Sequence, residues 1–276
     1  DELTGKLGLN YHLNDDAMLY ASYSRGYKAG GFALVQENSY DPESVDTFEV
    51  GLKSRWLDSR VQTNVAAFYS DYKNKQDFQR FQGPGNLTPF QIRNASAATM
   101  SGVEFEFQAQ LTDAFSVDGF VSYLNAEFDD FTSIDDVSPI GGGSRQLAGN
   151  KLPFSSEWSM HVGIQYDWTL GGVGSLSARG DYSWKDEQWT NAFNRTAAAN
   201  GLPSGGGSDG DRVPSYYQVN ARIQWISPES DWRAELYVKN LTDEVILSNP
   251  FVGATDFIFG TYLPPRNYGL KLTYSF

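Results

Sequence analysis

Few residues in this chain could form a catalytic centre. Cysteine is absent, and the only two histidines, His12 and His161, lie far apart in the sequence. No HExxH, P-loop or GxSxG motif occurs. Both histidines fall at polar positions of alternating segments, which favours a structural role over catalysis or metal binding. The sequence therefore predicts no catalytic residues, no metal site and no cofactor.

Two glycine-rich stretches could instead bind a ligand through backbone groups. They are residues 141–143 and residues 205–211, which read GGGSDGD. Backbone amides or carboxylates could converge there on a phosphate or on Ca²⁺. Neither stretch continues into a complete set of ligands, so a flexible extracellular loop is the favoured interpretation.

Composition narrows the fold class and the partners. The 21 basic and 34 acidic residues give a net charge of −13, which argues against nucleic acid as a partner. The 18 Phe, 16 Tyr, 7 Trp and 27 Gly suit many strands joined by turns. Mean hydropathy is −0.44, and no apolar run is long enough for a transmembrane helix. A membrane barrel remains possible, because alternating strands average to ordinary hydropathy.

Apolar and polar residues alternate along much of the chain, which predicts the strands that would position any site. At the C-terminus, Tyr268, Leu270, Leu272, Tyr274 and Phe276 occupy one face of a strand and polar or small residues the other. The same period recurs in about eleven predicted strands, at residues 4–13, 17–28, 46–57, 60–75, 99–112, 115–130, 156–169, 175–189, 215–227, 231–243 and 266–276. The predicted fold class is all-β, an antiparallel transmembrane β-barrel.

The connections between these strands alternate between short and long. Tight turns are expected at residues 14–16, 58–59, 113–114, 171–174 and 228–230, and long connections at 29–45, 76–98, 131–155, 190–214 and 244–265. Outer-membrane barrels have this arrangement, with short periplasmic turns and long extracellular loops. From Trp158 to Trp168 is roughly 33 Å of extended strand, about 25 Å of membrane normal once tilted. A soluble β-sandwich is the alternative, but its strands are typically shorter.

The odd number of strands predicts that the chain is part of a larger barrel. Complete single-chain bacterial barrels have an even number of strands, so that both ends emerge in the periplasm. Eleven strands alone would also leave two unpaired edges in lipid. We therefore expect further strands before residue 1.

Six segments resemble the TonB-dependent receptor family of outer-membrane transporters. They are LYASYSRGYKAGGF at 19–32, DTFEVGLKSRWLDSRVQTNVAAFYSDYKNKQ at 46–76, SGVEFEFQAQL at 101–111, LAGNKLP at 147–153, VKNLTDE at 238–244 and PPRNYGLKLTYSF at 264–276. The resemblance implies a 22-stranded barrel around a plug, with residues 1–276 as its C-terminal half. It also implies that the plug, the TonB box and the contact with the TonB–ExbB–ExbD complex belong to a missing N-terminal region.

The resemblance implies that the protein is a receptor in the bacterial outer membrane that imports a scarce nutrient. Its ligand would be a small molecule, most often a ferric siderophore, and it would not be an enzyme. A passive porin-like channel, or an outer-membrane barrel enzyme or adhesin, remains as an alternative. Membrane lipid is the expected surrounding partner.

Ligand contacts are expected at loop tips and on the upper lumen wall, where charged and aromatic side chains can hold a polar chelate. The candidates are Arg25, Tyr27, Lys28, Arg93, Asn94, Arg145, Trp189, Arg195 and Arg266. Ordinary salt bridging in the lumen or loops is the alternative role for the arginines. The ending Leu270, Leu272, Tyr274 and Phe276 resembles the signal that the barrel-assembly machinery reads.

Overall fold

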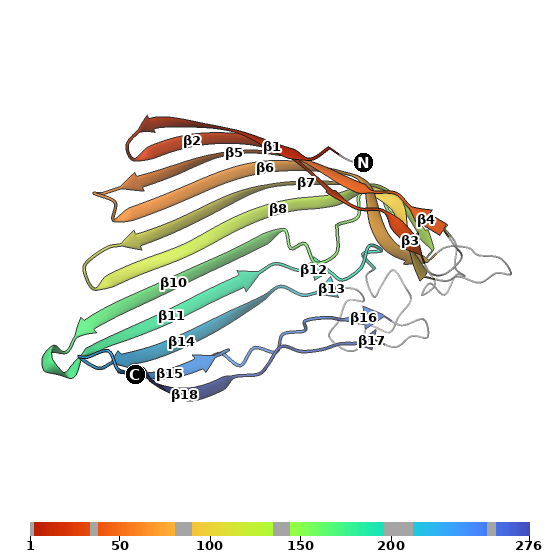
Figure 1. Ribbon diagram of the computed structural model, residues 1–276. Helices are drawn as coiled ribbons and strands as arrows, with labels where there is room; N and C mark the ends of the chain where they lie inside the picture. Colours follow the sequence, from red (N-terminus) through yellow and green to blue (C-terminus); the bar gives the residue numbers. More distant parts are fainter. Residues whose placement is uncertain (1–2, 34–37, 81–89, 135–143, 196–211, 253–257) are drawn as a thin grey trace.

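The computed structural model describes residues 3–33, 38–80, 90–134, 144–195, 212–252 and 258–276. Eleven strands form one antiparallel path in the order β1-β2-β5-β6-β7-β8-β10-β11-β14-β15-β18, and β9 is added beside β8 (Figure 1). The path contains β1 Gly5–Asn14, β2 Ala17–Lys28, β5 Glu43–Trp56, β6 Val61–Arg80, β7 Phe90–Gln110, β8 Phe115–Ile134, β10 Trp158–Thr169, β11 Ser175–Lys185, β14 Tyr216–Ile226, β15 Trp232–Lys239 and β18 Asn267–Tyr274. The predicted all-β antiparallel fold of about eleven strands is confirmed.

Short and long connections lie at opposite ends of the sheet, as predicted. The tight turns gather at one end, and the long connections gather at the other (Figure 1). The turn between β5 and β6 places Leu57, Asp58 and Ser59 at positive φ angles of 54°, 56° and 65°. The only helical element in the described ranges is the 3₁₀ turn Gly171–Val173, and no helix there is long and apolar enough to cross a membrane.

The pairing register gives the sheet one apolar and one polar face. On the apolar face, which we call outward, Val162 pairs with Tyr182 and Ile164 pairs with Gly180. Aromatic contacts occur on this face near both ends of the strands. Trp168 and Tyr166 lie 4.7 Å apart between ring centroids near the short turns, and Trp158 and Tyr123 lie 4.9 Å apart near the long connections. Two aromatic levels on one face are typical of a barrel that spans a bilayer.

Several predicted boundaries were wrong at the end with the long connections. Strands β6 and β7 pair as far as Arg80 with Phe90, so residues 76–80 and 90–98 continue the ladder where a loop was expected. Strand β8 likewise continues to Ile134. Strands β11 and β15 end earlier than predicted, at Lys185 and Lys239. The upper parts of β7 and β8 are stabilised by strand pairing and by a buried cluster that includes Ala98, Phe128 and Phe131, and apolar alternation in the sequence reports neither.

Short strands within the long connections were not predicted. They are β3 Gly31–Ala33 with β4 Asn38–Tyr40, β9 Ser144–Gln146, β12 Gln188–Trp189 with β13 Arg212–Val213, and β16 Phe251–Val252 with β17 Ile258–Phe259. Each has only two or three residues, which is too short for a visible period.

Asn240 explains the early end of β15. Its side-chain amide donates to the Glu244 carbonyl, and its side-chain oxygen accepts from the Glu244 amide, both at 2.9 Å. Asn240 and Asp243 have φ angles of 51° and 57°. The NLTDE stretch is therefore a closed turn built around one buried amide, which stops the strand.

Glycine allows close packing of tyrosine rings across the inward face. A Cβ added at Gly51 would overlap the ring of Tyr20 on the neighbouring strand, and one at Gly269 would lie 2.6 Å from the hydroxyl of Tyr237. In both places the ring covers the backbone of its neighbour, which excludes water from the ladder. Gly180 differs, because its added Cβ would meet only Ile164 at 3.8 Å.

We expect Gly51→Ala to lower the free energy of unfolding by about 1–3 kcal/mol, the usual cost of overpacking, because the Tyr20 ring must leave its position. Gly180→Ala is the matched control and should leave stability nearly unchanged. The measurement is the temperature at which the folded barrel loses its compact mobility on electrophoresis. Equal transition temperatures for the two variants would show that the ring contact contributes nothing.

Candidate functional site

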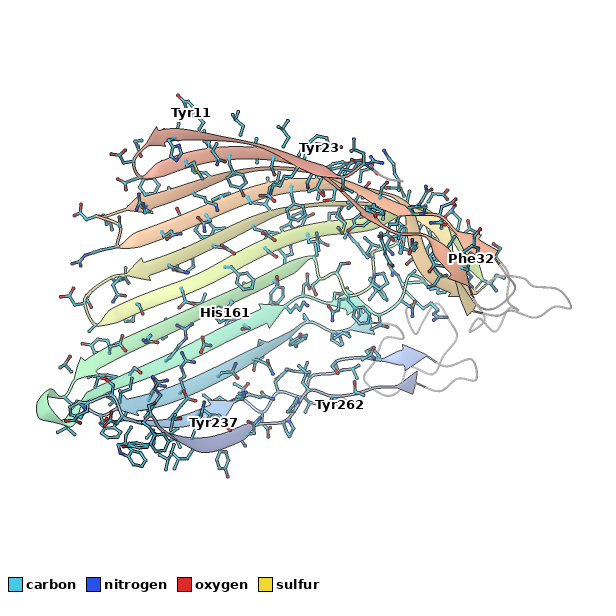
Figure 2. All side chains as sticks on the ribbon, in the orientation of Figure 1. Tyr11, Tyr23, Phe32, His161, Tyr237 and Tyr262 are labelled. Atoms are coloured by element: carbon cyan, nitrogen blue, oxygen red, sulfur yellow. The ribbon has the colours of Figure 1, made fainter. Side chains whose placement is uncertain are left out.

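A charged network lies on the inward face in the middle of the sheet. Arg179 donates to Asp118 at 2.6 and 3.0 Å and to Asp181 at 2.9 Å. His161 Nδ1 lies 2.9 Å from the Ser183 hydroxyl, and its Nε2 lies 3.6 Å from Asp181. Figure 2 labels His161 on this part of the sheet. Arg179 of β11 reaches past β10 to Asp118 of β8 and also pairs with Asp181 on its own strand, so the network links three strands of the wall.

Two long connections pack over the inward face at the end away from the short turns. We call residues 144–157 and 186–195 together the cap. In its first segment, the Leu152 amide donates to the Ala126 carbonyl at 3.0 Å and the Phe128 amide donates to the Asn150 carbonyl at 2.9 Å. The segment is thus bonded to the upper part of β8, where a free loop was predicted.

Side-chain amides join the two segments of the cap. Asn150 Nδ2 donates to the Ala192 carbonyl at 2.9 Å. The Lys151 amide donates to Asn194 Oδ1 at 2.7 Å, and Asn194 Nδ2 donates back to the Lys151 carbonyl at 3.1 Å. The Phe154 amide donates to the Trp189 carbonyl at 2.7 Å. These bonds tie the two segments of the cap to each other.

A buried apolar cluster joins the cap to the wall. Its buried members are Ala98, Ala126, Phe128, Phe131, Leu147 and Leu152, with Phe193 packed against them. Phe128 is only 1% exposed. Ala98, Ala126 and Phe128 follow the inward-facing period of β7 and β8, so this end of the inward wall is apolar and covered. Burial of these groups stabilises the cap on the wall.

Lys151 adds a polar edge to the cap. Its ammonium group lies 3.0 Å from a Glu127 carboxylate oxygen and donates to Asn125 at 2.5 Å. The side chain remains about one-third exposed. These partners hold the Lys151 ammonium group in place and neutralise part of its charge.

The connection between β2 and β5 is tied to the β6–β7 hairpin. Asn94 Nδ2 donates to the Asp41 carbonyl at 2.7 Å and to the Asn74 carbonyl at 2.8 Å. Gln76 Nε2 donates to the Ala29 carbonyl at 2.9 Å and to the Asp41 carbonyl at 3.1 Å. The predicted contact residue Asn94 therefore has a clear structural role, since its amide is occupied by backbone partners.

Two predicted contact residues lie on the outward face. Arg25 and Tyr27 follow the period of Tyr23 on β2, and Arg25 is paired with Asp46 at 2.8 Å. Lys28 follows the inward period and lies opposite Glu43. Arg25 and Tyr27 are therefore not oriented toward the lumen.

The remaining predicted residues are distributed around the end with the long connections. Arg145 is an exposed residue of β9, and Trp189 and Arg195 belong to the cap. Arg195 is 7% exposed, and its guanidinium lies 5.0 Å from the centre of the Phe193 ring. Arg93 lies in β7 opposite Asp77, and Arg266 is 3.6 Å from Asp243. The structure thus gathers Trp189 and Arg195 in the cap and leaves Arg266 near the far edge of the sheet.

The histidines and the glycine-rich stretches do not form a site that the structure describes. His12 is an exposed residue of β1, far along the sheet from His161. No group of three or more potential metal ligands occurs among the residues with described positions. Residues 141–143 and 205–211 lie outside the described residues.

Sequence reasoning missed the residues that organise the cap and the network. Asn150 and Lys151 stand in the LAGNKLP stretch, which carried the family resemblance without a role for either side chain. Asn194 and Gln76 have no distinguishing pattern in the sequence. The Asp118, Arg179 and Asp181 positions are visible as polar residues of alternating strands, but their pairing depends on register.

Comparison with known proteins gives consistent results. Residues 1–241 match the family described as TonB dependent receptor-like, beta-barrel. The chain is 29% identical over 124 residues to the metal-pseudopaline receptor of Pseudomonas aeruginosa, covering 45% of this chain and 17% of that protein. It is 27% identical over 159 residues to the pesticin receptor of Yersinia pestis, covering 56% of this chain and 21% of that protein. The chain thus matches about a fifth of the length of these relatives.

Solved structures share the fold. The ferric yersiniabactin uptake receptor of Yersinia pestis superposes with a TM-score of 0.77 at 19% identity, covering 99% of this chain and 37% of that chain. The siderophore receptor of Acinetobacter baumannii gives a TM-score of 0.71 at 17% identity, covering 98% of this chain and 35% of that chain. The chain therefore corresponds to part of such a barrel.

These matches confirm the predicted family, the predicted outer-membrane location and the prediction that the protein is not an enzyme. The family match covers most of the chain, and the strand order, the two faces and the alternation of turns agree with it. The chain belongs to the TonB-dependent receptor family and forms part of its outer-membrane β-barrel.

Proposed function

We propose that the protein carrying this chain binds a metal chelate outside the cell, with ferric siderophores as the leading class, and imports it with TonB-coupled energy. The observation that carries the proposal is the cap, whose two segments are hydrogen-bonded to each other and packed on a buried apolar cluster at the long-connection end of a receptor-family barrel. Segments that neighbouring contacts hold in place lose less entropy when a ligand binds to them.

The charges at this end suit an anionic chelate. Arg145 and Arg195 belong to the cap, and guanidinium groups form strong charge-assisted hydrogen bonds with carboxylates and phenolates. The names of the similar receptors, which refer to metal-pseudopaline, ferric yersiniabactin and siderophores, support the same ligand class. Lys28, Arg93, Asn94, Trp189 and Arg266 stay in the proposed contact set.

The remaining parts of the transport cycle are also proposals. We propose that residues 1–276 form the C-terminal part of the barrel, and that a plug and a TonB box are supplied by other residues of the protein. A passive porin-like channel is the rival. The family match favours the receptor over the porin.

Uptake of a radiolabelled ferric chelate should stop when a protonophore collapses the energy of the inner membrane, because release from a closed receptor requires work. The measurement is cell-associated iron over time in cells that express this receptor as their only route. A non-cognate small sugar entering through a general porin is the control. Uptake of the chelate that continues after collapse would favour the passive channel.

Arg145→Ala should weaken chelate binding by about ten- to a hundredfold, since loss of one charge-assisted hydrogen bond costs roughly 1.5–3 kcal/mol. Arg60→Ala is the matched control, because Arg60 lies at the short-turn end and should have no effect. Binding is measured on purified receptor by quenching of its intrinsic tryptophan fluorescence. If both variants bind like the wild type, Arg145 is not a contact residue.

Deletion of Phe276 should lower the amount of inserted receptor more than it changes chelate affinity in the receptor that does insert. The reason is that Phe276 is fully exposed, follows the outward period of Leu270, Leu272 and Tyr274, and meets Tyr274 edge-on at 5.1 Å. Phe276→Tyr, which keeps a terminal aromatic ring, is the control. Surface protein is quantified by labelling of intact cells, and unchanged levels after the deletion would remove the proposed assembly role.

A further inference from the structure

A groove of about 770 Å³ crosses the outward face of β1, β2, β5 and β6. Its floor is the row formed by Ala21, Val50 and Ala67, which are register partners on three adjacent strands. Two of these side chains are single methyl groups, so the surface is depressed along this row. Leu7 and Leu9 of β1 border the depression on one side.

An aromatic wall closes the groove on the side of the long connections. Tyr23, Phe48 and Tyr69 are the next register partners on the same face, and the rings of Tyr23 and Phe48 lie 5.0 Å apart. Tyr23 is also the register partner of Leu7, so the aromatic wall is continuous with the leucines of β1 that border the groove. Large rings beside small methyl groups explain the depth of the groove.

Charged groups begin immediately beyond the aromatic wall. Tyr23 donates its hydroxyl to Asp46 at 2.6 Å, and Arg25 is paired with the same carboxylate at 2.8 Å. On the next strand, Lys73 lies 3.2 Å from Asp71, which is the register partner of Asp46. The outward face therefore changes from apolar to charged within two residues, roughly 7 Å along the strand.

This change marks the level at which hydrocarbon gives way to lipid headgroups. It lies at the end with the long connections, so the groove faces the outer leaflet of the membrane. Lys73 is more than half exposed, and Arg25 is about one-third exposed. Two cations at headgroup level above an apolar groove are complementary to a phosphate above an acyl chain.

We propose that this groove is a specific lipid site that holds one acyl chain of an outer-leaflet lipid, with its phosphate bound at Arg25 and Lys73. The aromatic wall separates the chain from the headgroup, and Asp46 and Asp71 fix the orientation of the two cations. The occupant is a lipid because the groove lies at the depth of the hydrocarbon and is lined mainly by leucine, alanine, valine and aromatic side chains of the outward face.

The test is native mass spectrometry of the intact receptor, extracted in mild detergent and incubated with lipid A, a phosphorylated and acylated glycolipid. The wild type should retain one molecule. Ala67→Trp, which fills the floor, should lower retention by about tenfold, because each displaced methylene removes binding energy. Ala221→Trp is the matched control on the outward face of β14 and should retain lipid like the wild type.

A second variant tests the headgroup. The double change Arg25→Gln with Lys73→Gln should abolish the preference for lipid A over diacylglycerol, a neutral lipid with two acyl chains, without removing the chain site. Should Ala67→Trp fail to insert, Ala21→Leu provides a milder filling of the same floor. Equal lipid retention in wild type and floor variants would overturn the proposal. So would a wild type that is dimeric where the floor variant is monomeric, because the groove would then be a contact between two copies.

Discussion

The structure depends on one constraint, which is that a bilayer offers no hydrogen-bond partner to the backbone. Every amide and carbonyl group at membrane depth must therefore find its partner on a neighbouring strand. The register shifts fit this requirement. They occur between Tyr72 and Gln76 and between Ala97 and Ala98, at the end with the long connections, and between His12 and Asn14 beside a short turn. Across the central rows the ladder has no interruption, so irregular pairing is confined to regions where water can replace a lost bond.

The hydrogen bonds of the ladder lie within the sheet, so the side chains of its two faces can meet different requirements. The outward face consists mostly of apolar side chains, and the row at Ala21 and Ala67 is one of the places where they are small. The inward face is polar, and its charges must be neutralised locally, as Arg179 is by Asp118 and Asp181. The inward face also uses aromatic rings. The ring of Tyr20 covers the backbone at Gly51, which has no side chain, and adds no charge that would need a partner. The division into an apolar and a polar face explains why solved receptors superpose on this chain at 19% identity or less. Most positions of a strand require only an apolar or a polar residue, and few require one particular residue.

Under the proposed function, binding specificity falls to the long connections. The cap is the clearest case in this chain, because its two segments hold each other through Asn150 and Asn194 and bury Phe128 beneath them. In the proposed function, the wall and the cap together hold the side chains that contact the ligand. The same wall carries the proposed lipid groove on its other face, so the chain would meet two chemically different ligands on opposite sides of one sheet.

The sequence by itself determined the fold, the two faces and the order of short and long connections, because period-two alternation is a local property that each strand carries in its own residues. It also marked residues 147–153 and 238–244 as distinctive without giving their roles. Only the tertiary structure decided that Arg25 and Tyr27 face outward, that Asn94 is occupied by the Asp41 and Asn74 carbonyls, and that Asn150 meets a segment more than forty residues away. These contacts join distant parts of the chain. Their partners depend on the exact register of neighbouring strands and on the path of the connections, and no local pattern of residue types records either one.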